Sequence, residues 1–169
     1  TPGFFMMRIR IPSGIASVDQ ARTLAQISQQ FGRGLMDITT RQQLQLRGIR
    51  IEQVPEILRR LQEAGLTSLQ TGMDTIRNVV GCPVAGIGRD ELLDATPVVY
   101  QFTSMFVGNR AFTNLPRKFN VVITGCTLNC THVESQDLGL TPATREIDGK
   151  SVRNICKITG ERVGVHRDD

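Results

Sequence analysis

The chain has 169 residues, of which 40% are hydrophobic and 21% charged, an ordinary balance for a soluble globular protein with one medium domain or two small ones. Its formal net charge of +4 is compatible with binding to nucleic acid, an anionic cofactor or an anionic substrate, and does not distinguish among them. Tryptophan is absent, no apolar run is long enough to cross a bilayer and no signal-peptide pattern opens the chain, which argues against base stacking, a membrane span and secretion.

The first elements are a strand and a helix. Residues 4–11 alternate, with Arg8 and Arg10 on one face and apolar side chains on the other, which is typical of a strand with one buried side. Ser17 begins a capping box and predicts a helix start, and apolar residues then recur at helical spacing until Gly32 ends the helix.

Two more strands, a helix and a last strand follow. Residues 35–39 predict a short strand that runs into a longer one at 39–49. Pro55 suits the first turn of a second helix, which Gly65 ends, and residues 67–70 predict the last strand. The order βαββαβ predicts a compact α+β unit with both helices on one face of its sheet, so the other face is free to meet a ligand or partner.

The strand at 39–49, TTRQQLQLRGI, carries an unusual polar face. Alternation places two guanidinium and two amide side chains on the same side without an acidic residue among them: Arg41, Gln43, Gln45 and Arg47. Arg8 and Arg10 join this face if the two long strands are neighbours with matching pleats. The face either meets an anion or is a solvated sheet surface.

The amino-acid composition changes after residue 70. Residues 71–90 are glycine-rich and irregular, and they predict a long loop of the kind retained for binding. A helix is expected at 90–107, a strand at 121–123 and another strand at 138–142. Asp148-Gly149 is a hairpin signal.

Four runs in this order resemble one family: FMMRIRIPSG (5–14), TTRQQLQLRGI (39–49), DTIRNVVGCPVAG (74–86) and NLPRKFNVVITGC (114–126). They resemble the first half of the sirohaem-dependent nitrite and sulfite reductases, especially the ferredoxin-dependent type. The resemblance extends from Pro2 to Gly149. It implies an α+β fold with a ferredoxin-like half-domain at 1–70 and the N-terminal part of a sirohaem-binding domain at 71–150, followed by a divergent tail at 151–169.

The resemblance implies that the polar face binds sirohaem. This cofactor carries many carboxylates, and guanidinium and amide groups are suitable donors for them. The expected cofactor-binding residues are Thr39, Arg41, Gln43, Gln45, Arg47 and Asn78.

The resemblance also implies a cationic substrate site. Arg8, Arg77 and Lys118 are expected to hold a small oxyanion, because fixed positive charge stabilises an anion and an ordered cation with its waters can pass protons. Arg10 and Arg117 are either surface charges or braces for a carboxylate.

Asn120 distinguishes between two substrates. The sulfite enzymes of the family resemble one another in having a second lysine at this position, whereas the nitrite enzymes have asparagine. Nitrite carries one charge and sulfite two near neutral pH, so a pocket with one cation fewer suits nitrite. We therefore expect Asn120 to favour nitrite, with sulfite as the alternative.

The four cysteines are Cys82, Cys126, Cys130 and Cys156. Cys126 and Cys130 have the C-x3-C spacing of half a [4Fe–4S] site, but the resemblance places the cluster in the second half of the family's duplicated chain. The cysteines are scattered along the sequence, so buried or cavity-lining thiols come first, cluster ligands second, and a zinc site with His132 third. No metal ligand is predicted, and the cluster is expected only from the missing second half.

The resemblance implies assimilatory reduction of nitrite to ammonium with electrons from ferredoxin. We expect this chain to be inactive without its other half, and to act in the cytoplasm or, alternatively, the plastid stroma. The alternatives are half of a sulfite reductase, or a non-catalytic module that binds sirohaem or pairs with itself or a partner. Nucleic acid and membrane partners are not expected. Acidic ferredoxin should meet a basic surface, for which Arg59, Arg60 and Arg89 are candidates.

Overall fold

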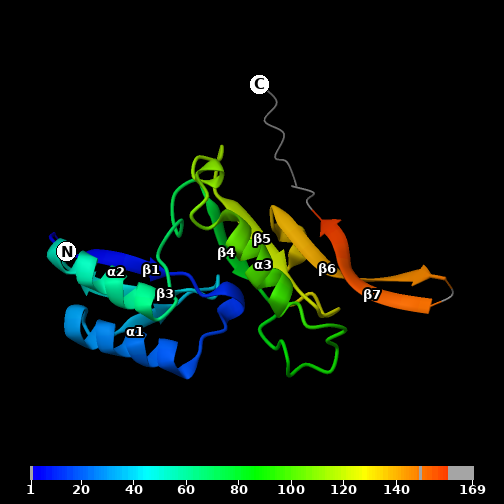
Figure 1. The fold of residues 1–169 in the computed structure, drawn as a ribbon, viewed down its shortest axis with the longest axis horizontal. Coiled ribbons are helices and arrows are strands. Elements are labelled where there is room, and N and C mark those ends of the chain that lie inside the picture. The colour runs from blue at the N-terminus through cyan, green and yellow to red at the C-terminus, as the bar shows by residue number, and fades with distance from the viewer. Residues whose placement is uncertain (1, 149, 160–169) are drawn as a thin grey trace.

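The computed structural model describes residues 2–148 and 150–159, which form two units that lie side by side, each with its own sheet (Figure 1). The first unit has the strand order β1-β3-β2, all antiparallel, with two helices packed on one face. Its elements are β1 (Phe5–Ile9), α1 (Val18–Phe31), β2 (Met36–Ile38), β3 (Leu44–Ile49) and α2 (Val54–Glu63). The predicted α+β class is confirmed.

Local sequence signals set the ends of both helices. Ser17 caps α1 because its hydroxyl accepts the Gln20 backbone N–H at 3.1 Å, while the Gln20 side chain accepts the Ser17 N–H at 3.0 Å. Helix α2 has a proline in its first turn and ends at Glu63, and Gly65 just beyond it has a φ of +68°, a left-handed conformation that glycine adopts without strain. The predicted boundaries of these helices are confirmed.

The core of the first unit fixes which face of the sheet remains polar. Buried apolar side chains from the strands and helices pack together on one side: Ile9, Ile11, Leu24, Ile27, Leu46, Ile49, Ile57, Leu61 and Leu66. In the ladder of β1 and β3, Arg8 lies opposite Gln45 and Met6 lies opposite Arg47. Because paired residues of antiparallel strands share a face, these four side chains lie on the side away from α1 and α2.

Two predicted strands are shorter than expected. The strand predicted at 39–49 begins only at Leu44, because Arg41 and Gln42 form the turn between β2 and β3, where Gln42 has a φ of +55°. The predicted strand at 67–70 is reduced to one bridge between Arg10 and Thr67. Some of the alternating polar residues therefore belong to a turn, so alternation alone overestimated the length of the strand.

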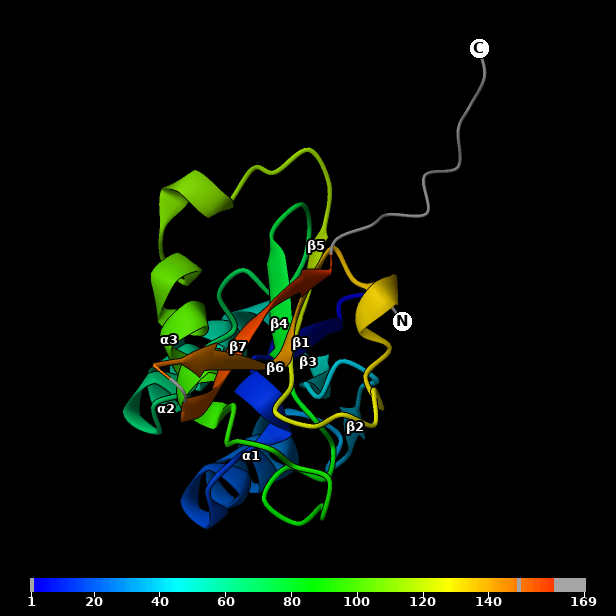
Figure 2. The same cartoon turned by 90° about the vertical axis from the view of Figure 1, so that its right-hand side faces the viewer.

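The second unit is a four-stranded sheet with one covering helix. Strands β4, β5 and β6 are parallel neighbours in that order, and β7 pairs antiparallel with β6. Its elements are β4 (Ile76–Val80), α3 (Thr96–Phe106), β5 (Phe119–Ile123), β6 (Leu138–Ile147) and β7 (Lys150–Thr159). Figure 2 shows α3 on one side of this sheet. The described residues also contain four short 3-10 helices: η1 (Pro12–Gly14), η2 (Ile51–Gln53), η3 (Arg110–Phe112) and η4 (Val133–Ser135).

Strand β4 corrects the prediction of an irregular loop at 71–90. Its neighbours bury it on both faces, with Val79 in the core under α3 and Val80 in a smaller cluster with Val122 and Val133. Arg77 and Asn78 interrupt its apolar residues, so neither strict alternation nor a continuous apolar run marked it as a strand.

The remaining predictions for the second unit can be compared element by element. The strands at 121–123 and 138–142 are confirmed as parts of β5 and β6, and Ile147 pairs with Lys150, as a hairpin at 148–149 requires. The expected helix at 90–107 begins later, at Thr96. The predicted tail at 151–169 lies in β7 as far as Thr159, and the rest lies outside the described residues. No helix in the described ranges is long and apolar enough to span a bilayer.

Gly125 is a sharp test of how the second unit packs. A Cβ atom at this position would lie 1.8 Å from the Leu93 carbonyl oxygen, which is backbone and cannot rotate away. Gly125→Ala should therefore lower the free energy of unfolding by about 2–3 kcal/mol, as overpacking does. Gly72→Ala, where a Cβ would meet nothing within 4 Å, should change it by less than about 0.5 kcal/mol. Urea unfolding of both variants makes the comparison, and equal effects would contradict this packing.

Candidate functional site

Four arginine side chains meet where the two units join. Arg8 of β1 and Arg77 of β4 both donate from Nη1 to the carbonyl oxygen of Thr71, each at 3.0 Å. Arg10 and Arg41 are close enough for the charge of Arg77 to lower the pKa of each, although burial is the larger cause in both cases. We call Arg8, Arg10, Arg41 and Arg77 the arginine cluster.

Arg10 is the buried centre of the cluster, with 2% of its surface exposed. Its terminal nitrogens donate to the carbonyl oxygens of Gln70 at 2.6 Å and of Arg77 at 3.0 Å, and its guanidinium lies 5.0 Å from the ring centroid of Phe106. Burial, followed by the charges of Arg77 and Arg41, lowers its pKa to about 10. The expectation of a surface charge or a carboxylate brace was wrong, because Arg10 joins β1 to the second unit through backbone carbonyls.

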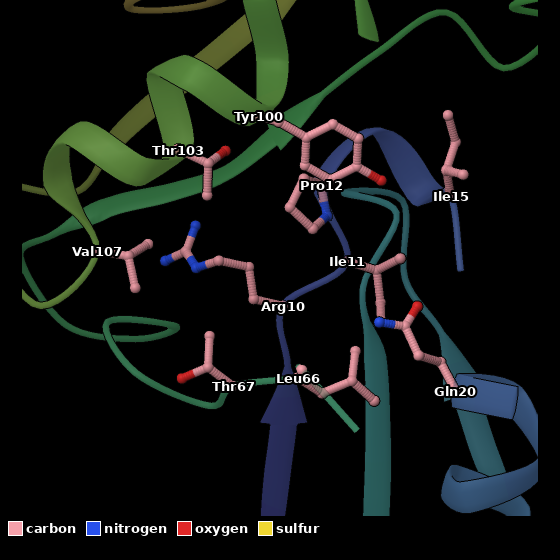
Figure 3. Close-up of a pocket in the computed structure, with 11 residues that line it drawn as sticks. Arg10, Ile11, Pro12, Ile15, Gln20, Leu66, Thr67, Tyr100, Thr103 and Val107 are labelled. Carbon is pink, nitrogen blue, oxygen red and sulfur yellow. The ribbon is translucent and has the colours of Figure 1, made fainter. Parts of the chain in front are cut away.

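A cavity of about 190 Å³ lies beside Arg10, between the first unit and α3 (Figure 3). Figure 3 shows the Arg10 side chain extending toward Thr103 of α3 and Val107, which follows this helix, and away from Gln20. Apolar side chains such as Leu66 form part of the wall, and the terminal nitrogens of Arg10 already donate to carbonyls. This cavity is therefore not where the charge of the cluster would meet an anion.

Arg41 holds the turn between β2 and β3 against the second sheet. Its Nη2 donates to the carbonyl oxygens of Asn78 at 2.8 Å and Val121 at 3.2 Å, and its Nη1 donates to the Gln136 side chain at 3.2 Å. Burial lowers the pKa of Arg41, and Arg77 lowers it further, while Asp137 acts in the opposite direction. In this structure, Arg41 positions the turn through protein acceptors.

Asn78 and Gln42 complete the junction between the units. Asn78 is fully buried, and its Nδ2 donates to the carbonyl oxygens of Ile11 at 2.7 Å and Arg41 at 2.9 Å. The Gln42 amide makes a paired contact with Gly81, donating to its oxygen at 3.0 Å and accepting from its N–H at 2.9 Å. Gln42 was not among the predicted site residues, because strict alternation placed it on the opposite face from Arg41.

Of the other expected cofactor residues, Thr39 and Gln43 lie beside the turn before β3, and Gln45 and Arg47 lie in β3. The Thr39 hydroxyl accepts the Gln43 N–H at 3.1 Å, and the buried Gln43 side-chain nitrogen has no partner among the described residues. Gln45 is half-buried on the polar face. Arg47 is exposed and pairs with Asp37 at 2.5 Å, so that carboxylate already neutralises it.

Lys118 and Asn120 lie on either side of Phe119, the first residue of β5. Phe119 pairs with Ile76 of β4, the residue before Arg77. Lys118 is exposed and has no hydrogen bond or ion pair within the described ranges. The Asn120 backbone N–H donates to the Asp137 carboxylate at 2.8 Å, and Arg117 lies 3.4 Å from the other oxygen of the same carboxylate. Arg117 thus braces a carboxylate, which was one of its two expected roles.

The arginine cluster has no ion-pair partner in the part of the chain that the structure describes. The Nε–H groups of Arg8, Arg10 and Arg41 are buried without an acceptor among these residues. Like charges held together at partial burial cost free energy, which a bound anion would offset. The charge and donors of the cluster therefore fit a polycarboxylate, and Arg8, Arg41 and Arg77 are partly exposed whereas Arg10 is buried.

The expected ferredoxin surface is largely neutralised on α2. Arg59 and Arg60 both donate to Glu56 at 2.8 Å, and Arg59 also pairs with Glu63. The hydrogen bonds from Arg59 and then Arg60 lower the pKa of Glu56 to about 2. Of the three candidates, only Arg89 has no ion-pair partner among the described residues.

The thiols of Cys82 and Cys126 are buried, whereas Cys130 is exposed. Cys82 and Cys126 each line a separate pocket, as the expectation of buried or cavity-lining thiols requires. No group of three or more His, Cys, Asp or Glu side chains in the described ranges could hold a metal ion. The side chain of Cys156 lies outside the described residues.

The fold and the site define an α+β protein in which a ferredoxin-like unit and a mixed sheet meet at a cationic junction. Residues 1–64 match the family model described as the nitrite/sulfite reductase ferredoxin-like half domain, and residues 72–155 match the nitrite and sulphite reductase 4Fe-4S domain. The chain belongs to the nitrite and sulfite reductase family. Its predicted domain boundaries at 70 and 150, like the roles of its site residues, stay predictions.

Relatives named as nitrite reductases share the sequence but are much longer. The chain is 49% identical over 158 residues to a ferredoxin–nitrite reductase of Leptolyngbya laminosa, covering 90% of this chain and 31% of the relative. A chloroplastic ferredoxin–nitrite reductase of Arabidopsis thaliana is 45% identical over 85% of this chain and 25% of its own length. The solved structure of Mycobacterium tuberculosis NirA superposes with a TM-score of 0.79 and 38% identity, over 86% of this chain and 26% of that one.

The carbonyl contacts of Arg10 predict a large effect on stability. Arg10→Met should lower the free energy of unfolding by about 2–3 kcal/mol, because buried carbonyls of residues 69–77 lose their donors. Arg22→Met is the matched control, because Arg22 is exposed and its one ion pair among the described residues is with Asp19, so this change should lower the free energy of unfolding by less than about 0.5 kcal/mol. Urea unfolding measures both, and a neutral Arg10→Met would contradict the joining role of Arg10.

Proposed function

We propose that this chain supplies sirohaem- and oxyanion-binding residues to a ferredoxin-dependent assimilatory nitrite reductase, which reduces nitrite to ammonium. The observation that carries the proposal is the convergence of four guanidinium groups that form no ion pair within 4 Å in the described ranges, although the charges of Asp137 and Asp74 act on Arg41 and Arg77 at longer range. The names of the relatives support nitrite as substrate and ferredoxin as donor. Because the chain spans about 31% of the first of these relatives, the activity belongs to the proposal.

The chain's own residues divide into donors and positioning groups in this proposal. Gln45 is partly exposed on the polar face and would bind a carboxylate of sirohaem. Arg8 and Arg77 each donate one N–H group to Thr71, so their other donors would bind a sirohaem carboxylate in addition to the oxyanion expected from the sequence. Arg41 and Asn78 would hold the turn and β4 in place through their carbonyl contacts. When bound, sirohaem supplies an iron centre that binds the oxyanion and passes electrons to it.

Cations beside the substrate have a separate task. Arg8, Arg77 and Lys118 would stabilise the negative charge of nitrite, and the ammonium group of Lys118 can deliver protons because it remains unpaired by described residues. Asn120 presents an amide where a lysine would add a second ammonium group. One cation fewer suits a monoanion, which favours nitrite over sulfite.

The proposed partners follow from the length of the relatives and from surface composition. The [4Fe–4S] cluster and the other wall of the cofactor site would come from the part of the family enzyme that this chain does not span. Phe5 and Met6 are exposed apolar residues on β1, next to Arg8, and would contact that part or a second copy of this chain. Ferredoxin would dock at a basic surface, in the cytoplasm or the plastid stroma.

Cofactor retention tests the role of Arg41. The test uses a chimera that carries this chain in place of the matching segment of the Leptolyngbya laminosa reductase. In it, Arg41→Ala should lower the amount of sirohaem bound per protein several-fold, because the turn loses the hydrogen bonds that hold it to β4 and β5. Arg110→Ala removes the same charge from an exposed site and should retain the cofactor. Absorbance per protein measures the occupancy, and unaltered sirohaem in Arg41→Ala would remove this role.

Substrate choice tests Asn120. In the same chimera, Asn120→Lys should raise the ratio of kcat/KM for sulfite to that for nitrite by on the order of tenfold, because a second cation favours the dianion. Asn114→Lys adds the same charge at an exposed position and should leave the ratio unchanged. The substrate assignment fails if both variants show the same ratio as the parent.

A further inference from the structure

One buried carboxylate at the start of β6 holds the chain on both sides of Lys118. Asp137 directly precedes β6, and its side chain is 5% exposed. Its Oδ2 accepts the Asn120 backbone N–H at 2.8 Å, and its Oδ1 accepts from the Arg117 guanidinium at 3.4 Å. Lys118 lies between Arg117 and Asn120 in the sequence, so the same carboxylate restrains the chain before and after this lysine.

The strand register explains why the carboxylate meets this N–H group. Strands β5 and β6 are parallel, with Val121 opposite Leu138, so Asn120 lies level with Asp137. The preceding N–H, that of Phe119, donates to the carbonyl oxygen of the residue before β4 at 3.1 Å. Consecutive N–H groups of a strand point to opposite sides, so the Asn120 N–H faces β6, where the Asp137 carboxylate accepts it.

The two contacts of Asp137 contribute unequally to this restraint. The Arg117 side chain is 57% exposed, so solvent weakens its ion pair with the carboxylate. The hydrogen bond from Asn120 is partly buried, and a hydrogen bond from a backbone N–H to a carboxylate is stronger than one between neutral groups. The contact with the Asn120 backbone therefore does most to fix the segment that contains Lys118.

Lys118 is the residue that benefits from a fixed backbone. Its side chain is exposed and has no hydrogen bond or ion pair with the residues that the structure describes. An ammonium group on a flexible four-carbon stem meets an anion productively only when the backbone of the lysine is held in the right place. Gln136, next to Asp137, accepts from Arg41 at 3.2 Å, so the segment that restrains Lys118 also contacts the arginine cluster.

We propose that Asp137 is a positioning residue of the anion site, which sets the place of the Lys118 ammonium group by holding the Asn120 backbone and the Arg117 side chain. This inference rests on the proposed nitrite reductase function, in which Lys118 stabilises the bound oxyanion and delivers protons to it. Asp137 acts through Lys118, because its own carboxylate is engaged by Asn120 and Arg117. A carboxylate that only completed the pairing of β5 and β6 would support the fold without changing how Lys118 acts.

Hydrogen exchange in the chimera described above tests the restraint without nitrite or electrons. With exchange resolved to single amides by mass spectrometry, Asp137→Ala should raise the exchange rate of the Asn120 amide by on the order of tenfold. Asp137→Asn keeps a side-chain oxygen that can accept the same N–H, and its rate should stay within about threefold of the parent. Glu134→Ala removes an exposed carboxylate three residues earlier and should leave the rate unchanged. Equal rates in Asp137→Ala and the parent would overturn the proposal.

Nitrite kinetics test whether Asp137 acts through Lys118. In the same chimera, Asp137→Ala should lower kcat/KM for nitrite about tenfold at unchanged sirohaem per protein, and Asp137→Asn should stay within about threefold of the parent. Adding Asp137→Ala to Lys118→Ala should lower kcat/KM by no more than about twofold further, because the group that Asp137 positions is already absent. Glu134→Ala should match the parent.

Three kinetic results would overturn the positioning role. They are independent losses in the double variant, equal losses in Asp137→Ala and Asp137→Asn, and full activity of Asp137→Ala despite faster exchange, since the carboxylate would then support only the fold. An inactive parent chimera would refute the proposed function and, with it, the role of Asp137. An active parent with any of the three results refutes the role of Asp137 alone.

Discussion

The structure depends on guanidinium groups that are held by backbone carbonyls instead of carboxylates. Arg10 and Arg41 reach from the first unit into the second and donate to carbonyl oxygens of residues 69–78 and Val121. Each contact stabilises the junction, yet none removes the positive charge, and burial of like charges lowers the pKa of both groups. The cost of assembling the cluster is the free energy that an anion can recover.

This arrangement separates positioning from recognition within one set of residues. The buried members, with Asn78 and Gln42, fix how the two sheets meet. Arg8 and Arg77 are partly exposed and share the Thr71 carbonyl, and each guanidinium has further N–H donors that a carboxylate or an oxyanion could use. A ligand that binds across this side would contact both units, which explains how one cofactor could be shared between a ferredoxin-like domain and a parallel sheet.

Sequence reasoning predicted the helices and most strands because their signals are local, such as the Ser17 capping box and the alternation in β1. Alternation in the two long strands placed Arg8 and Arg41 on a polar face without acidic residues, whereas Arg77 was named only through the family resemblance. Sequence reasoning missed β4, whose burial depends on strands distant in sequence, and it mistook the turn at Arg41 for strand. The sequence could not show that Arg10 is buried, because its partners are backbone carbonyls, which every residue type has.

The central claim of the proposal is that the net positive charge of the arginine cluster binds the carboxylates of sirohaem. A titration of this chain with sirohaem, followed by absorbance at increasing salt concentration, tests it most directly. The account predicts that the double variant Arg8→Gln with Arg77→Gln raises the Kd by about tenfold or more, with a weaker salt dependence than the parent. An unchanged Kd in the double variant would contradict it.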